Sequence, residues 1–331
     1  MTSMENDFFL RPGVVNISLT DRCTATCTMC ATNSNPDEWG AEIDVKRGLA
    51  WVDGVAKVQG PIGICFIGGE PFLRRDAMLA LTERAHGHRL LVSVVSNCFW
   101  AQTAQAAQRV LEPLKEAGLT RITVSTDSFH RPFVTEQAVD NAIGAARKLG
   151  LRCNLNVVWG DASDAIPELL KRLKNSDYLD ETSSFECLPV GRGVEIIPRS
   201  KPEMPDERCR LVISTLSIKS NGDVFACCGV GGFTPPLKVG NADRETIPEL
   251  VERACRDPLL LALGLRGPQW LRSLTEGLLP PRPAGYVNYC HLCHELMTRP
   301  DCVHAMRHNL DGLAPLFMAE ATVLARLSKA G

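Results

Sequence analysis

Apolar and polar positions follow two alternating periods over the first 190 residues. Short runs rich in β-branched residues are followed by longer segments with apolar residues at helical spacing, and this order occurs six times. The segments 103–118 and 136–150 end on glycine, a common helix stop. Repeated βα units predict an α/β protein with a parallel sheet. The expected strands are 14–20, 62–68, 90–96, 121–127, 152–158 and 184–190.

The pattern changes after residue 193. Residues 209–228 contain two strand-like runs joined by Ser-Asn-Gly-Asp, which predicts an antiparallel hairpin. Helical segments follow over 245–278, and a last helix is expected from about residue 313. We therefore predict three parts, namely a partial (β/α)6 TIM-like barrel over 1–195, a small domain with a β-hairpin and helices over 200–312, and a C-terminal helix over 313–331.

Composition narrows the class of protein. Apolar residues make up 45% and charged residues 22% of the chain, which is typical of a globular protein. The formal net charge of −2 gives no electrostatic reason to expect nucleic acid. The N-terminus lacks a secretory signal, and no apolar run approaches the ~18 residues of a spanning helix. We expect a cytoplasmic protein with no membrane partner.

The chain has 14 cysteines, and the reducing cytosol favours metal binding over disulfides. The exceptions are expected to be small buried residues in strand-like runs, namely Cys65, Cys153 and Cys187. Cys23, Cys27 and Cys30 form a CxxxCxxC motif after the first strand. The next ten residues offer no fourth zinc ligand, whereas three thiolates on a four-iron four-sulfur cluster would leave one iron open to a substrate.

Gly-Gly-Glu-Pro follows the second strand, and the two motifs together resemble the radical S-adenosylmethionine (SAM) enzymes. The resemblance implies that Cys23, Cys27 and Cys30 hold the cluster. The open iron would chelate SAM, which is then split to methionine and a 5′-deoxyadenosyl radical that removes a substrate hydrogen atom. The SAM contacts implied by the resemblance are Met29, Gly68, Gly69, Glu70, Ser96, Asn97, Ser125, Asp127 and Asn156.

Several residues of this site carry a specific expectation or an alternative role. Met29 occupies a position that is usually aromatic in the family, and we expect it to pack on adenine. For Ser96, Asn97 and Asp127, helix capping or turn formation is an alternative reading. His130 is expected to be a loop histidine. The glycines are expected to permit close backbone approach.

A second ordered set of cysteines lies in the C-terminal part. Cys209, Gly222 and Cys227, followed by a CxxC pair, resemble the twitch domain, a shortened SPASM domain. The resemblance implies one auxiliary four-iron four-sulfur cluster with four thiolate ligands: Cys209, Cys227, Cys290 and Cys293. A zinc ribbon with the same four ligands is the alternative. Cys302 alone is too little for a further cluster.

Cys228 follows a presumed ligand and serves neither cluster. Neighbouring side chains on a strand point to opposite faces, so Cys228 is expected to face away from the auxiliary cluster, where its thiol could return a hydrogen atom to a substrate radical. The alternative is a packed thiol or a spare ligand. The arrangement resembles radical SAM peptide epimerases, which implies inversion of an L-residue in a ribosomally made peptide.

Other readings of the reaction stay open. A dehydrogenase of a sugar-like alcohol or a peptide crosslinking enzyme would use the same motifs, and a non-enzymatic zinc-binding module would use only the cysteines. A reductant such as flavodoxin or ferredoxin is the implied protein partner. About twenty residues precede the first cysteine, so we expect the barrel itself to hold a peptide.

Overall fold

The computed structural model describes residues 12–37, 40–60, 62–196, 207–229 and 233–327. Within them runs one nine-stranded sheet of order β6-β5-β4-β3-β2-β1-β7-β8-β9. The strands are β1 (Val14–Ser18), β2 (Gly63–Ile67), β3 (Leu91–Ser96), β4 (Leu119–Ser125), β5 (Arg152–Trp159), β6 (Glu181–Glu186), β7 (Thr215–Ile218), β8 (Asp223–Phe225) and β9 (Lys238–Asn241).

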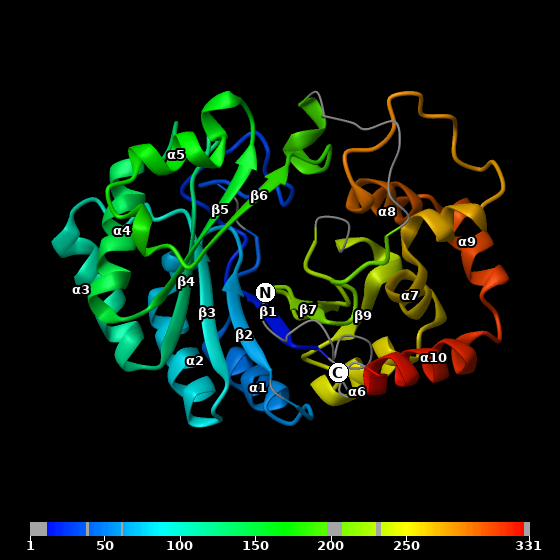
Figure 1. The fold of residues 1–331 in the computed structure, drawn as a ribbon. Coiled ribbons are helices and arrows are strands. Elements are labelled where there is room, and N and C mark those ends of the chain that lie inside the picture. The colour runs from blue at the N-terminus through cyan, green and yellow to red at the C-terminus, as the bar shows by residue number, and fades with distance from the viewer. Residues whose placement is uncertain (1–11, 38–39, 61, 197–206, 230–232, 328–331) are drawn as a thin grey trace.

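Helices cover the outer side of the first six strands and form a separate group beyond β7–β9 (Figure 1). The first group is α1 (Val45–Val55), α2 (Arg75–Gly87), α3 (Ala104–Glu116), α4 (Glu136–Leu149) and α5 (Ile166–Arg172). The second is α6 (Ile247–Arg256), α7 (Pro258–Ser273), α8 (Tyr289–Thr298), α9 (Pro300–Asn309) and α10 (Ala314–Leu327). No helix in the described part of the chain is long and apolar enough to cross a membrane.

Strands β1 to β6 pair in parallel and in chain order, as the sequence predicts. Two predicted ranges were displaced. β4 ends at Ser125 because the next two residues leave the sheet, where Asp127 caps the following loop. β6 was predicted over 184–190 but occupies Glu181–Glu186. Pro189 lacks the N–H that a ladder needs, and the apolar residues around it form a turn.

The predicted hairpin is present and extends the barrel sheet. β7 and β8 pair antiparallel, and Gly222 in the turn between them has a φ of +88°, which favours glycine. β7 also pairs in parallel with β1, from Val14 opposite Thr215 to Ile17 opposite Ile218. The barrel and the C-terminal part therefore share one continuous sheet.

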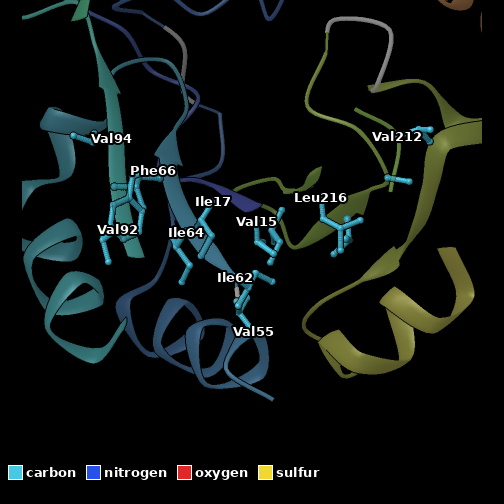
Figure 2. Close-up of a cluster of buried hydrophobic side chains, with 14 of the residues drawn as sticks. Val15, Ile17, Val55, Ile62, Ile64, Phe66, Val92, Val94, Val212 and Leu216 are labelled. Carbon is cyan, nitrogen blue, oxygen red and sulfur yellow. The ribbon is translucent and has the colours of Figure 1, made fainter. Parts of the chain in front are cut away.

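Alternation along the strands separates a helix-facing side from a concave side. Figure 2 shows Val15, Ile17, Ile64 and Val92 pointing from neighbouring strands into one apolar cluster. All four are fully or almost fully buried in the core. The intervening residues, which include Asn16 and Cys65, point to the opposite, concave side.

Local signals explain where the predicted helices begin and end. The Thr103 and Thr135 hydroxyls accept hydrogen bonds from the first turns of α3 and α4. α4 stops at Gly150, which is in the left-handed conformation with a φ of +65°. Both helices therefore agree with the predicted segments within a few residues.

Candidate active site

The loop after β1 brings its three cysteines to the wall of one cavity. This cavity holds about 650 Å³ of empty space, and Cys23, Cys27 and Cys30 all line it. It lies at the carboxyl ends of the strands, the edge where parallel barrels carry their chemistry. Other residues singled out in the sequence also line it, namely Met29, Gly68, Gly69, Glu70, Ser96, Asn97, Ser125 and His130.

The two glycines after β2 allow this turn to dock on the cysteine loop. The N–H groups of Gly69 and Glu70 donate to the carbonyl oxygens of Thr20 and Arg22, each at 2.8 Å. A Cβ on Gly69 would lie 1.9 Å from the Arg22 oxygen, and one on Gly68, whose φ is +150°, would lie 2.4 Å from the Thr20 oxygen. The close approach expected of these glycines is therefore to the cysteine loop itself.

Glu70 is a buried carboxylate held on several sides. It accepts hydrogen bonds from the backbone N–H of Phe72 at 3.1 Å, from the Ser96 hydroxyl at 2.9 Å and from the backbone N–H of Asn97 at 2.8 Å. Burial raises its pKa to about 7, although these donors lower it. The carboxylate is thus fixed at the cavity wall and titrates near neutral pH.

Ser96 and Asn97 combine cavity lining with local structure. The Asn97 amide nitrogen donates to the Thr24 hydroxyl at 3.1 Å and lies 3.8 Å from Cys23 Sγ. Its amide oxygen accepts from the backbone N–H of Phe99, which is the turn predicted as the alternative reading. Asn97 therefore links the end of β3 to the cysteine loop.

Asp127 and Asn156 do not lie on the cavity wall in the described part of the chain. One oxygen of the fully buried Asp127 accepts from the backbone N–H of Phe129 and of His130 and lies 2.8 Å from His130 Nδ1. The other accepts from the backbone N–H of Val158. The turn-forming alternative accounts for Asp127, while Asn156 lies beside Ser125 in the sheet register.

Arg192 is a cavity residue that the sequence reasoning missed. Its Nε donates to the Cys27 carbonyl at 2.9 Å and an Nη to the Ser34 carbonyl at 2.8 Å, and its backbone N–H donates to the Cys30 carbonyl at 3.0 Å. The preceding Gly191 has a φ of +59°, and a Cβ there would lie 2.5 Å from the Cys30 oxygen. The motif Val-Gly-Arg-Gly had indicated only the end of the barrel.

The chemistry of the three thiols fits an iron-sulfur cluster. Burial is the main cause of the raised pKa values of Cys23, about 11, and Cys27, about 12, and the neighbouring thiols contribute to both. These two buried thiols need a strongly positive group before they ionise together. No histidine lines this wall beside them except His130.

The four cysteines of the C-terminal part line a second cavity. Cys209, Cys227, Cys290 and Cys293 surround about 310 Å³ of empty space. The Gly229 N–H donates to Cys227 Sγ at 3.2 Å, a contact that stabilises thiolate ligands. Within the described residues, no three cysteine, histidine or acidic side chains converge tightly enough to hold a single metal ion. The donor set suits a cluster with four thiolates.

Local structure explains how these cysteines meet. Asn288 caps α8 by accepting from the backbone N–H of Cys290 at 3.0 Å, and Cys293 follows one turn later on the same face. The backbone N–H of Cys209 donates to the Leu263 carbonyl in α7 at 3.1 Å. Cys302 is fully buried in α9 and does not line this cavity.

Cys228 neighbours the concave side of the barrel sheet. Burial raises the pKa of its thiol to about 11, the thiols of Cys209 and Cys65 add to the rise, and a hydrogen bond with Thr215 lowers it. Thr215 begins β7 and Cys65 lies on the concave side of β2. The thiol is absent from the lining of the auxiliary cavity, while that of Cys227 belongs to it.

A parallel barrel with three thiols at its carboxyl edge defines a class of cluster-dependent enzyme. Residues 17–173 match the model of the Radical SAM superfamily. This segment is a radical SAM domain. A radical SAM domain implies SAM and a four-iron four-sulfur cluster.

Two curated relatives differ in how much they share with this chain. The putative peptide biosynthesis protein YydG of Bacillus subtilis is 23% identical over 271 residues, which cover 79% of this chain and 83% of the relative. A probable GTP 3′,8-cyclase of Methanocella arvoryzae is 37% identical over 154 residues, but these cover only 44% of this chain and 47% of that protein.

Solved structures share the fold. The structure of anSMEcpe with bound AdoMet aligns with a TM-score of 0.57 at 15% identity, covering 92% of this chain and 99% of that chain. BtrN in complex with AdoMet and 2-DOIA aligns with a TM-score of 0.50 at 14% identity, covering 78% and 89%. The barrel with a C-terminal extension is therefore a known arrangement.

Binding of SAM is expected to weaken at acid pH because of Glu70. The carboxylate can accept hydrogen bonds from the SAM amino group above its pKa of about 7, and it is protonated below that pH. Affinity should fall by up to about tenfold per pH unit below 7. Calorimetric titration of SAM from pH 5.5 to 8.5 measures this. Glu70→Gln should bind weakly with no such dependence, and an equally steep profile in that variant would contradict the assignment.

Removal of the Arg192 guanidinium should loosen the cysteine loop. Each lost charge-assisted hydrogen bond is worth about 1.5–3 kcal/mol. In a background without Cys290 and Cys293, Arg192→Ala should lose most of the iron bound after anaerobic reconstitution and alter the electron paramagnetic resonance spectrum. Arg192→Lys should restore part of the iron, since an ammonium can still donate to one carbonyl. Arg75→Ala, at an exposed position, is the control, and equal iron in Arg192→Ala and this control would exclude the clamp.

Proposed function

We propose that the protein is a radical SAM epimerase that inverts an L-residue of a ribosomally made peptide, with Cys228 as the hydrogen donor. The observation that carries the proposal is a thiol on the concave side of the sheet, away from the three-cysteine edge. Cys228 neighbours Thr215 and Cys65, whereas the SAM cavity opens at the far ends of the same strands. A substrate between them would meet the 5′-deoxyadenosyl radical, which removes a hydrogen atom, on one face and the Cys228 thiol, which donates one, on the other.

The cofactor residues would divide the work between two cavities. Cys23, Cys27 and Cys30 would hold the first cluster, with Arg192 fixing their loop and Glu70 accepting from the SAM amino group. When bound, cluster and SAM supply a 5′-deoxyadenosyl radical that takes one hydrogen atom from Cα of the L-residue. The similarity to YydG over most of both chains supports a peptide as substrate.

The inversion step consumes one hydrogen atom from the Cys228 thiol and one reducing equivalent, which restores that thiol. The Cys228 S–H bond breaks as a new C–H bond forms on the opposite face of the Cα radical. A thiyl radical remains on Cys228, and one electron and one proton restore the thiol. The electron would come from a flavodoxin or ferredoxin type of reductant through the auxiliary site, whose ligands are Cys209, Cys227, Cys290 and Cys293.

Heavy water distinguishes this reaction from its alternatives. The S–H hydrogen exchanges with solvent, so each turnover in heavy water should place one deuterium on the inverted carbon of the substrate peptide. Chiral amino-acid analysis and mass spectrometry measure the product. In ordinary water the peptide mass should not change. Loss of two hydrogens would instead favour dehydrogenation or crosslinking.

Cys228→Ala should still form 5′-deoxyadenosine but give no D-residue, because the substrate radical has no donor. Cys65→Ala is the matched control, since it removes a neighbouring thiol from the same side of the sheet and should keep inversion. Both variants are assayed for 5′-deoxyadenosine and for D-residue content. Full inversion by Cys228→Ala would return this cysteine to a packing role, and loss in the control alone would make Cys65 the donor.

The auxiliary cysteines should be needed for product but not for SAM cleavage. The double variant Cys290→Ala and Cys293→Ala should lose about half of the iron, from about eight to about four per chain. It should retain reductive SAM cleavage, because those thiols line the other cavity. Cys302→Ala, a buried cysteine outside both cavities, should keep all of the iron. Unchanged product formation by the double variant would separate the auxiliary site from turnover.

A further inference from the structure

Arg121, a cation whose Nε has no hydrogen-bond partner among the described residues, lies on the concave side of the barrel, below the SAM cavity. In β4, Ile122 and Val124 belong to the core, so Arg121, Thr123 and Ser125 point to the other side. Ser125 lines the SAM cavity, which identifies this side as the substrate side. At strand spacing, Arg121 lies about 13 Å below Ser125 along the strand.

The Nε of Arg121 is buried, and no carboxylate of the residues that the structure describes forms an ion pair with this side chain. Its Nε is buried without a hydrogen-bond partner, and of the buried unpartnered side-chain atoms among the described residues it is the only one on a cation. By contrast, Arg47 pairs with Asp243, and Arg266 with Glu320. A guanidinium stays charged at all physiological pH values, and an unmet buried donor costs free energy. A site with these properties favours an anion.

The sheet register relates Arg121 to the proposed hydrogen donor. One row across the concave side runs through Asn16, Cys65, Ser93, Arg121 and Arg152. Burial raises the pKa of Cys65, whereas a hydrogen bond with Ser93 and the charge of Arg121 lower it, so the guanidinium acts on this thiol. Cys65 in turn acts on Cys228. The register row and these charge effects therefore place the cation on the same side of the sheet as Cys65 and Cys228.

Among the described residues, no carboxylate on this side forms an ion pair with Arg121. Glu181 on β6 accepts a hydrogen bond from the Asn154 amide at 3.1 Å. Arg152 lies opposite Arg121 in the register and adds a second, exposed positive charge. The planar guanidinium matches a carboxylate with two parallel hydrogen bonds.

We propose that Arg121 binds a carboxylate of the substrate peptide. The inference rests on the proposed function for its substrate class. In the sheet order, Arg121 on β4 and Thr215 on β7, the hydrogen-bond partner of Cys228, are four strand spacings apart, at most about 19 Å, which an extended peptide spans in about six residues. The carboxylate is thus an acidic side chain within about six residues of the inverted position, or the chain terminus itself.

Binding of three synthetic heptapeptides of valine and glycine tests the proposal. All are acetylated. One carries a central glutamate and an amidated end, one a central glutamine and an amidated end, and one a central glutamine and a free C-terminal carboxylate. Dissociation constants are measured by saturation-transfer nuclear magnetic resonance on the reconstituted enzyme with SAM. At least one carboxylate peptide should bind about tenfold more tightly than the neutral peptide, and which one does so identifies the source of the carboxylate.

Variants make the assignment specific. Arg121→Gln should abolish the preference, Arg121→Lys should retain part of it, and Arg152→Gln should keep most of it. Thermal melting checks that each variant is folded. If Arg121→Gln does not fold, the comparison of Arg121→Lys with the native enzyme tests the proposal instead. Equal binding of the three peptides by the native enzyme, or a preference that survives in Arg121→Gln, would overturn the proposal. Peptide binding is measured without turnover. A failure to form D-residues would therefore contradict the proposed function without changing the outcome of this binding test.

Discussion

The docking of one backbone turn on another is the contact on which the active site depends. Gly69 and Glu70 donate their N–H groups to the carbonyls of Thr20 and Arg22. Neither Gly68 nor Gly69 has room for a Cβ. The same turn carries the Glu70 carboxylate into the cavity, and Arg192 holds the cysteine loop from the other side. Three segments far apart in the chain are thereby fixed around the three thiols. Short backbone hydrogen bonds are directional, so the loop is preorganised before any cofactor binds.

Pairing between β1 and β7 gives the protein its second organising constraint. The strand that leads into the cysteine loop is bonded on its other edge to the hairpin that carries Cys227 and Cys228. Both sets of cysteines are therefore held in position by the same sheet. A thiol on the hairpin keeps a fixed position relative to the three-cysteine cavity, and the proposed inversion would require this fixed relation.

Much of the candidate site could be predicted because spacing and strand order encode it. Cys23, Cys27 and Cys30 share one loop, and the glycines with Glu70 follow the next strand, so adjacent parallel strands bring them together. The four later cysteines lie around one cavity, as the twitch resemblance implied. Prediction was weaker for single polar residues. Asp127 accepts hydrogen bonds from its own loop and from Val158 on β5, and nothing in the motif Ser-Thr-Asp distinguishes a capping carboxylate from a ligand-binding one.

The sequence by itself determined which segments form helices and strands, the class of fold and the two sets of cysteines, because these follow from local pattern and spacing. Tertiary structure alone decided which groups share a space. Arg192 reaches the cysteine loop through hydrogen bonds across more than 150 positions of chain, and the buried Arg121 Nε is left without a hydrogen-bond partner among the described residues. Such relations depend on register, on which face a side chain takes and on what fills the space opposite, and none of these is a property of a residue's neighbours in sequence.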